Sequence, residues 1–252
     1  MYKTIEYIET GKLAVLKLNR PEKRNAMNRE MIHELTLLFD YLKQDKNVVM
    51  LQVVGKGEAF CSGADIEWLN EIKHATQEDI ELEFRRLSEM LEAFYNIPQI
   101  IVTFVHGSVY GGGIGLVACS DFVVSAPETT FSFSEIKLGL LPATISPFVV
   151  KKTGIHYAKQ LFFTGEKFDE HKAMKVHLVD QVAQPSTNDE TIIEKLLKQP
   201  HHSLLAVKKL LRGVDNNEIT LSNIKKSSAL ISGLLKTKET QNLLDKFLNA
   251  KG

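Results

Sequence analysis

Cysteine is scarce in this chain, and other marks of a secreted or membrane protein are missing too. Of the 252 residues only Cys61 and Cys119 are cysteine, without metal-ligand spacing. A disulfide framework and a cysteine-based zinc site are therefore excluded, and a reducing, cytoplasmic setting is expected. No apolar run reaches the roughly 18 residues that a membrane span needs. The segment from Met1 to Glu6 lacks the pattern of a signal peptide.

Net charge is absent as well. The chain has 31 Lys and Arg against 31 Asp and Glu, so nucleic acid and anionic membrane surfaces are not expected partners. A hydrophobic content of 44% with 25% charged residues is ordinary for a globular protein. The length suits either one large domain or a domain with a smaller appendage.

The order of elements predicts an α/β core followed by a helical region. Apolar and β-branched runs predict strands, and apolar residues at helical spacing predict helices. The expected strands are 5–8, 13–18, 48–54, 100–105, 122–125 and 178–182. The expected helices are 28–42, one from 65, 80–95 and 113–119, with helical patterns from 148 onward and from 191 to 249, broken at 199–200, 213 and 233. Strands and helices first and helices alone last indicate a core plus an α-helical appendage.

Four glycines crowd into five positions at Gly111–Gly115, directly after the strand expected at Ile100–Val105. A strand that turns through glycines into a helix directs free backbone N–H groups at the space before the helix, where negative charge is favoured. The alternative is a tight turn with close helix packing. The spacing matches neither nucleotide-binding fingerprint, so the cluster indicates a carbonyl or oxyanion site rather than a phosphate site.

A second turn of similar design occurs at Ala59–Ile66, where small residues lead to Asp65 at a helix start. Alone it is a helix cap that leaves the Ala64 N–H as a candidate donor. Two such turns in one chain are more informative, because two converging N–H groups make an oxyanion hole.

Glu135 lies in the largely apolar stretch Phe131–Pro142. A carboxylate in such surroundings is either ion-paired for structure or desolvated toward a pKa that suits proton transfer. The segment by itself leaves both possibilities open.

Taken together and in this order, these segments resemble the crotonase (enoyl-CoA hydratase/isomerase) superfamily. The resemblance covers nearly the whole chain, through segments 20–21, 60–66, 106–113, 134–140, 164–168 and 176–180. It implies a spiral of β-β-α turns in residues 1–190, which bind acyl-CoA and perform catalysis. It also implies a C-terminal α-helical trimerisation region in residues 191–252 and assembly as a trimer or a hexamer.

The same resemblance assigns roles to individual residues. The N–H groups of Ala64 and Gly112 polarise the thioester carbonyl and stabilise its enolate, while Glu135 is the catalytic acid/base. No cofactor is implied, since coenzyme A is part of the substrate. The segments that match coenzyme A and substrate contacts contribute Lys23, Arg24, Ala26, Ser62, Gly63, Asp65, Ile66, Tyr110, Gly111 and Lys209.

Gly115 departs from the pattern of the usual fatty-acid hydratases, which carry a second catalytic glutamate there. A glycine removes a negative charge and is expected to open space beside the β-carbon of the acyl group. Residues 140–150 resemble most the 3-methylglutaconyl-CoA hydratase-like branch, which acts in leucine and isoprenoid catabolism. We therefore expect a branched acyl group, with a carboxylated one as a further option.

Three function classes remain open on sequence. The leading one is a lyase that hydrates an enoyl-CoA, and the second is a Δ3,Δ2-enoyl-CoA isomerase in which Glu135 shuttles the proton. The third is a non-catalytic acyl-CoA-binding or RNA-binding protein. Cys61 is not expected to act as a nucleophile, since no histidine lies near it in sequence. His106 is expected to be structural, and Trp68 to line the pocket or the core.

Overall fold

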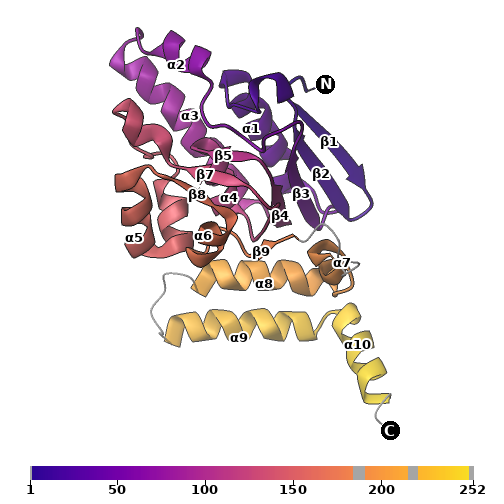
Figure 1. Ribbon diagram of the computed structural model, residues 1–252. Coiled ribbons are helices and arrows are strands. Elements are labelled where there is room, and N and C mark those ends of the chain that lie inside the picture. Colours follow the sequence, from indigo (N-terminus) through magenta and orange to yellow (C-terminus); the bar gives the residue numbers. More distant parts are fainter. Residues whose placement is uncertain (1, 184–190, 215–220, 250–252) are drawn as a thin grey trace. The chain divides into compact units, whose positions relative to one another are not determined.

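The computed structural model describes residues 2–183, 191–214 and 221–249 (Figure 1). The chain divides into two compact units, Met1–Asp189 and Glu190–Gly252. All strands of the described residues belong to the first unit, and the described elements of the second unit are helices.

A six-stranded sheet forms the framework of the first unit, in the order β1-β2-β3-β4-β6-β9. Its strands are β1 (Ile5–Thr10), β2 (Leu13–Leu18), β3 (Met50–Gly55), β4 (Ile100–Val105), β6 (Phe122–Ser125) and β9 (Gln181–Val182). β1 and β2 form an antiparallel hairpin through Gly11, whose φ of 63° suits glycine. Every other pairing is parallel, so the connections have to cross over the sheet.

A second, three-stranded sheet was not expected from the sequence. It consists of β5 (Ser108–Tyr110), β7 (Thr130–Ser132) and β8 (Lys167–Asp169), in the order β5-β7-β8. Three-residue strands are too short to show the alternation by which strands are predicted. β5 leaves β4 through Gly107, at a φ of 59°, and leads directly into the glycine turn.

The described helices of the first unit are α1 (Arg29–Gln44), α2 (Ile66–Ile72), α3 (Gln77–Asn96), α4 (Gly112–Cys119), α5 (Ser146–Thr164) and α6 (Glu170–Lys175), with 3-10 turns η1 (Pro21–Lys23) and η2 (Ser134–Leu138). Four of these six helices begin at a capping side chain, and α4 and α5 begin without one. Asn28, Asp65 and Thr76 each accept a hydrogen bond from a backbone N–H of the helix that they precede. The helix starts expected at Asn28 and Asp65 are therefore confirmed.

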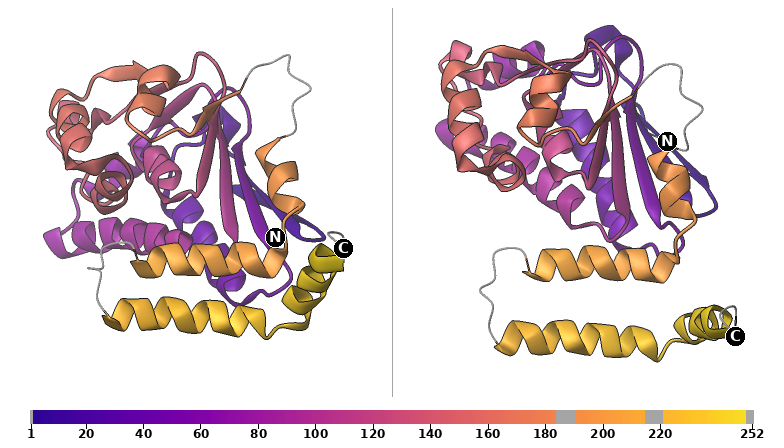
Figure 2. Two further views of the ribbon diagram at one scale, coloured as in Figure 1. Left: turned by 90° about the horizontal axis from the view of Figure 1, so that it is seen from below. Right: turned by 60° about the horizontal axis from the view of Figure 1, so that its bottom comes forward.

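The core of the first unit lies between the large sheet and the helices beside it. Figure 2 shows α3 and α5 on the same side of this sheet. α1 and α3 pack together through the stacked rings of Phe39 and Phe94, whose centroids lie 4.6 Å apart.

The second unit contains α7 (Ile192–Leu197), α8 (His201–Val214), α9 (Leu221–Leu235) and α10 (Lys238–Asn249). Thr191 and Glu194 form a reciprocal capping box at the start of α7. The break expected at Gln199–Pro200 is present, but the one expected at Gly233 is wrong, because Gly233 lies inside α9. Among the described residues no helix is long and apolar enough to cross a bilayer.

Candidate active site

The turn before α2 leaves the Ala64 N–H without an acceptor among the described residues. Ala64 forms an isolated parallel bridge with Met27. The two hydrogen bonds of this bridge use the atoms on either side of Ala64: the Met27 N–H donates to Gly63 O (2.8 Å), and the Asp65 N–H donates to Met27 O (2.9 Å). In a parallel bridge the residue between those atoms directs its own N–H away from the partner strand.

The glycine turn presents a second N–H of this kind. Gly112 is the first residue of α4, so its N–H has no partner within the helix. Gly111 before it has a φ of 47° and a ψ of −117°, a conformation that suits glycine and aims the start of the helix. No acceptor for the Gly112 N–H exists in the part of the chain that the structure describes.

The two turns lie against each other. Cys61 and Val109 form a parallel bridge, in which the Cys61 N–H donates to Ser108 O (3.1 Å) and the Tyr110 N–H donates to Cys61 O (2.9 Å). Gly63 Cα lies 3.5 Å from the position that a Cβ on Gly111 would take. The two turns that the sequence analysis considered together are therefore in contact in the structure.

Glu135 reaches the same place from η2. Its Oε1 lies 3.2 Å from the point where a Cβ on Gly111 would sit, and its Oε2 is buried without a hydrogen-bond partner among the described residues. Burial raises the pKa of the Glu135 carboxyl, and a bond from its own backbone N–H lowers it less. The sequence left open whether this carboxylate is ion-paired or desolvated. Within the described chain the structure shows no ion pair for it, and its surroundings are desolvating.

The space around Gly115 is filled. A Cβ on Gly115 would lie 2.7 Å from Ile145 Cγ2 and 3.0 Å from Leu91 Cδ1. Both side chains are buried. The expectation that this glycine opens space is therefore wrong, because two apolar side chains occupy the volume toward which a side chain at position 115 would point.

The basic residues expected to meet coenzyme A are engaged in surface ion pairs. Lys23 Nζ lies 2.7 Å from Glu67 Oε1, and Arg24 Nε lies 2.6 Å from Glu58 Oε1. These pairs are exposed, so each is worth little and can exchange for a phosphate partner.

The other residues expected to bind substrate take varied positions. Ala26 and Asp65 are buried, and Ile66 is 81% exposed. The Ser62 N–H donates to Arg24 O (3.0 Å). Lys167 Nζ lies over the ring of Tyr110, 5.8 Å from the ring centroid. Lys209 belongs to α8 of the second unit, and its contact with coenzyme A stays a prediction.

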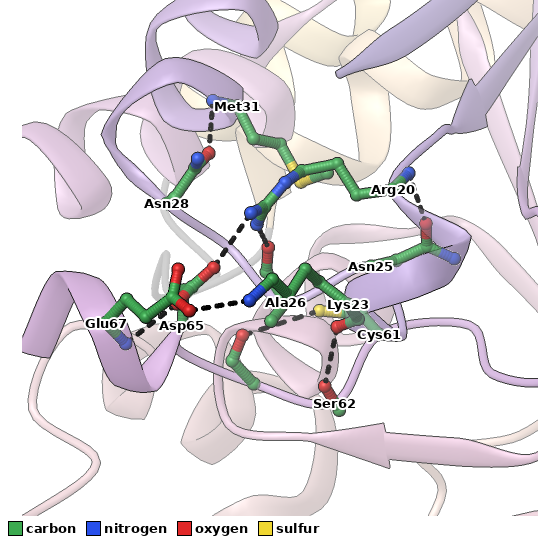
Figure 3. Close-up of polar contacts among 11 residues, drawn as sticks. Arg20, Lys23, Asn25, Ala26, Asn28, Met31, Cys61, Ser62, Asp65 and Glu67 are labelled. Atoms are coloured by element: carbon green, nitrogen blue, oxygen red, sulfur yellow. Dashed lines mark hydrogen bonds and ion pairs between the residues drawn. The ribbon is translucent and has the colours of Figure 1, made fainter.

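Arg20 was not assigned a role from the sequence, yet it ties the loop before α1 to the Ala64 turn. Figure 3 shows its guanidinium between Ala26 and Asp65: it donates to Ala26 O and pairs with Asp65 Oδ2 at 2.9 Å. Burial opposes ionisation of Asp65, but bonds from Arg20 and the Glu67 N–H outweigh it and lower the pKa of this carboxyl. No local signal in the sequence could have found this contact, because forty-five positions separate Arg20 from Asp65.

Two other candidates have structural contacts. Burial raises the pKa of the Cys61 thiol to about 11, which disfavours the thiolate that a nucleophile requires. His106 Nε2 lies 2.9 Å from Gly57 O, in keeping with a structural role. Among the described residues no group of three His, Cys, Asp or Glu side chains could hold a metal ion.

A cavity of about 740 Å³ opens between α1, α2 and α3. Trp68 lines it, 3% exposed, and donates through Nε1 to Glu83 Oε2 at 3.1 Å. The cavity lining includes Asp65 and Arg20 but not Ala64, Gly112 or Glu135. Ala64, Gly112 and Glu135 thus lie outside this cavity, and Trp68 belongs to the core.

Comparisons with known proteins identify the family of this chain. Residues 9–251 match the family model described as enoyl-CoA hydratase/isomerase. An Alternaria alternata enoyl-CoA hydratase is 30% identical over 75% of this chain, which spans 61% of that protein's length. The trans-2-decenoyl-[acyl-carrier-protein] isomerase of Streptococcus mutans is 28% identical over 83% of this chain and 82% of its own.

A solved structure confirms the expected fold. The crystal structure of an enoyl-CoA hydratase from Shewanella pealeana superimposes with a TM-score of 0.90, covering 99% of this chain and 94% of that one at 26% identity. The α/β crotonase fold with a helical C-terminal region is therefore correct, whereas the comparisons do not distinguish the 3-methylglutaconyl-CoA hydratase-like branch.

Proposed function

Since the chain belongs to the enoyl-CoA hydratase/isomerase family, we propose that it adds water across the α,β double bond of an enoyl-CoA thioester. The observation that carries this proposal is the buried Glu135 carboxylate, whose Oε2 has no partner among the described residues and whose Oε1 faces the glycine turn. A buried carboxylate left unpaired is costly for the fold, and proton transfer gives it a use.

In this proposal the thioester oxygen accepts hydrogen bonds from the N–H groups of Ala64 and Gly112. As a water oxygen bonds to the β-carbon, the π electrons move toward the thioester oxygen, and the two N–H groups stabilise the resulting enolate. Glu135 takes a proton from the water and then returns one to the α-carbon. Its raised pKa makes it a stronger base than an exposed glutamate.

Isomerisation of a 3-enoyl-CoA is the second candidate. It is favoured by the apolar wall that Ile145 and Leu91 form beside Gly115. Moving a double bond requires one group that carries a proton from C2 to C4, and no water. Ile145 and Leu91 occupy the volume in which a second carboxylate would activate water. A chain with Glu135 alone is equipped for this proton shuttle, and the Streptococcus mutans relative is named an isomerase.

The apolar wall also changes the expected acyl group. The prediction of a branched or carboxylated chain relied on the resemblance of residues 140–150 and on open, uncharged space at Gly115. Because Ile145 and Leu91 fill that space, we propose an uncharged acyl chain as the preferred substrate. A carboxylate beside these side chains would be desolvated without a partner.

Self-association is proposed from the second unit. Its described helices carry exposed apolar side chains, including Val207, Leu211, Ile231 and Leu235. Apolar stripes exposed in this way mark contact surfaces. We propose a trimer or a stacked pair of trimers, to be tested by light scattering, and a cytoplasmic enzyme that needs no cofactor besides the coenzyme A of its substrate.

A substrate panel tests the proposed reaction. Purified protein is incubated with crotonyl-, 3-methylcrotonyl-, 3-methylglutaconyl- and 3-hexenoyl-CoA in D2O, and products are identified by NMR. We expect hydration of crotonyl-CoA with deuterium at the α-carbon, and the same reaction about 10²–10⁴-fold slower with Glu135→Gln. Conversion of 3-hexenoyl-CoA alone would replace the hydratase by the isomerase, and a preference for 3-methylglutaconyl-CoA would contradict the uncharged acyl chain.

A further inference from the structure

Met27 contacts both donor turns, one through its backbone and one through its side chain. Its backbone N–H and carbonyl bond to Gly63 and Asp65, on either side of Ala64. Its Sδ lies 2.6 Å from the position that a Cβ on Gly112 would take, and Cε lies at 3.5 Å. Only 1% of Met27 is exposed, so the thioether is a fixed part of the packing between the turns.

This double contact bears on the distance between the two donors. An oxyanion hole works only if both N–H groups come within about 2.7–3.1 Å of one oxygen atom. A displacement of about 1 Å in such an arrangement can lower the rate about 10²-fold. The thioether of Met27 lies against Gly112 on one side, while Cys61 lies against Gly113 on another. The first turn of α4 is thereby held between two side chains.

The loop that carries Met27 is itself rigidly held. Arg20 binds Ala26 O and Asp65, as Figure 3 shows. Asn25 accepts from the Arg20 N–H (2.8 Å) and donates through Nδ2 to Lys56 O and Ala59 O (both 2.8 Å). These bonds fix Arg24 and Asn25 at φ values of 50° and 54°, which non-glycine residues rarely adopt. The backbone that precedes Met27 is therefore held in place by these hydrogen bonds.

We propose that Met27 is a positioning residue of the oxyanion hole: its thioether sets the separation of the Ala64 and Gly112 N–H groups. The inference rests on the proposed function, in which these two groups bind the thioester oxygen. In this inference Met27 acts through the two turns rather than through a contact of its own with the substrate.

The test compares Met27→Ala with Met27→Leu and with Met50→Ala. Met50 is also fully buried, but it is the first residue of β3 and pairs with Leu13 and Ile100. The length of the strand separates it from the turns. We expect Met27→Ala to lower kcat about 10–100-fold and to change the Kd for saturated butyryl-CoA less than about 3-fold. Met27→Leu should restore most of the rate, and Met50→Ala should lose stability while retaining kcat.

Polarisation of the thioester carbonyl can be measured directly. A substitution that only destabilises the fold would not change it. An aryl-conjugated enoyl-CoA absorbs at longer wavelength when its thioester oxygen accepts hydrogen bonds. We expect the full spectral shift with the wild type and Met50→Ala, a smaller one with Met27→Ala, and a partial recovery with Met27→Leu. If Met27→Ala does not fold, Met27→Val takes its place, since valine also lacks atoms beyond the γ position.

The outcomes separate this inference from the proposed reaction. A full spectral shift and full kcat in folded Met27→Ala or Met27→Val would overturn the positioning role. A wild type that shows the shift but turns over no enoyl-CoA would overturn the reaction, and the comparison of shifts would still decide the role of Met27. A wild type without any shift would overturn the oxyanion hole and the inference together.

Discussion

The Glu135 carboxylate and Gly111 occupy adjoining space, with Oε1 3.2 Å from the point where a Cβ on residue 111 would sit. At the same time Gly111 has a φ of 47°, which disfavours any side chain. One residue therefore both turns the chain into α4 and leaves room for the carboxylate. This relationship links the direction of the Gly112 N–H to the position of the proposed acid/base, Glu135.

Replacing Glu135 tests its role as the base. Glu135→Gln keeps the shape of the side chain but cannot take up a proton, so we expect kcat to fall about 10²–10⁴-fold. In the wild type, kcat/KM should rise with pH through a pKa above that of an ordinary glutamate, because burial raises the pKa of Glu135. A pH series on the preferred enoyl-CoA measures both.

The matched control for this experiment is Glu81→Gln, which removes an exposed glutamate on α3. It should leave the rate and the pH profile unchanged. A Glu135→Gln protein that retains a tenth or more of the wild-type kcat would show that another group transfers the proton.

The same substitution is expected to stabilise the folded protein above acidic pH. Because the pKa of Glu135 is higher in the folded state than in the unfolded chain, the folded state binds more protons between these two values and loses stability as the pH rises. Glutamine never ionises and avoids this loss. Thermal unfolding should therefore give a higher Tm for Glu135→Gln at pH 8, and the two proteins should converge below about pH 4. Equal Tm differences at both pH values would contradict an unpaired carboxylate.

The Gly112 N–H can be tested with a pair of variants. Gly112→Ala keeps the N–H but places a Cβ against Met27 Sδ, whereas Gly112→Pro adds the same crowding and removes the N–H. Proline is tolerated at the first position of a helix, so both variants can be compared once circular dichroism shows that they fold. We expect Gly112→Pro to be about 10²–10³-fold slower than Gly112→Ala. Equal rates would remove this N–H from the site.

Overpacking is expected at Gly115. The Cβ of Gly115→Ala would come within 2.7 Å of Ile145 and 3.0 Å of Leu91, and such crowding typically costs about 1–3 kcal/mol. Denaturant unfolding should show this loss, and Ile145→Val in the same chain should recover part of it. A stable Gly115→Ala protein would mean that the volume is open, as the sequence had suggested.

The sequence predicted the structure of the two turns because each leaves a local signature. Glycines after a β-branched run predicted the turn at Gly111, and the capping side chain of Asp65 predicted the start of α2. The six strands of the large sheet were expected for similar reasons. Asn28, a capping residue before an apolar periodic run, predicted the start of α1.

What remained hidden depends on contacts between distant segments. The sheet of β5, β7 and β8 is built from three-residue strands whose pairing joins residues 108–110, 130–132 and 167–169. Nor could the sequence reveal that Ile145 fills the space at Gly115, since thirty positions separate them. The double contact of Met27 is likewise a product of the folded packing.

Both free cysteines are buried, and Cys61 forms the bridge between the two donor turns. Its thiol has a raised pKa and no access to solvent, so an alkylating reagent can modify it only after the turns separate. The rate of Cys61 alkylation therefore reports how often the donor turns open, and Cys119 reports on the far end of α4. The protein thus carries built-in chemical probes at both ends of the helix that begins with Gly112.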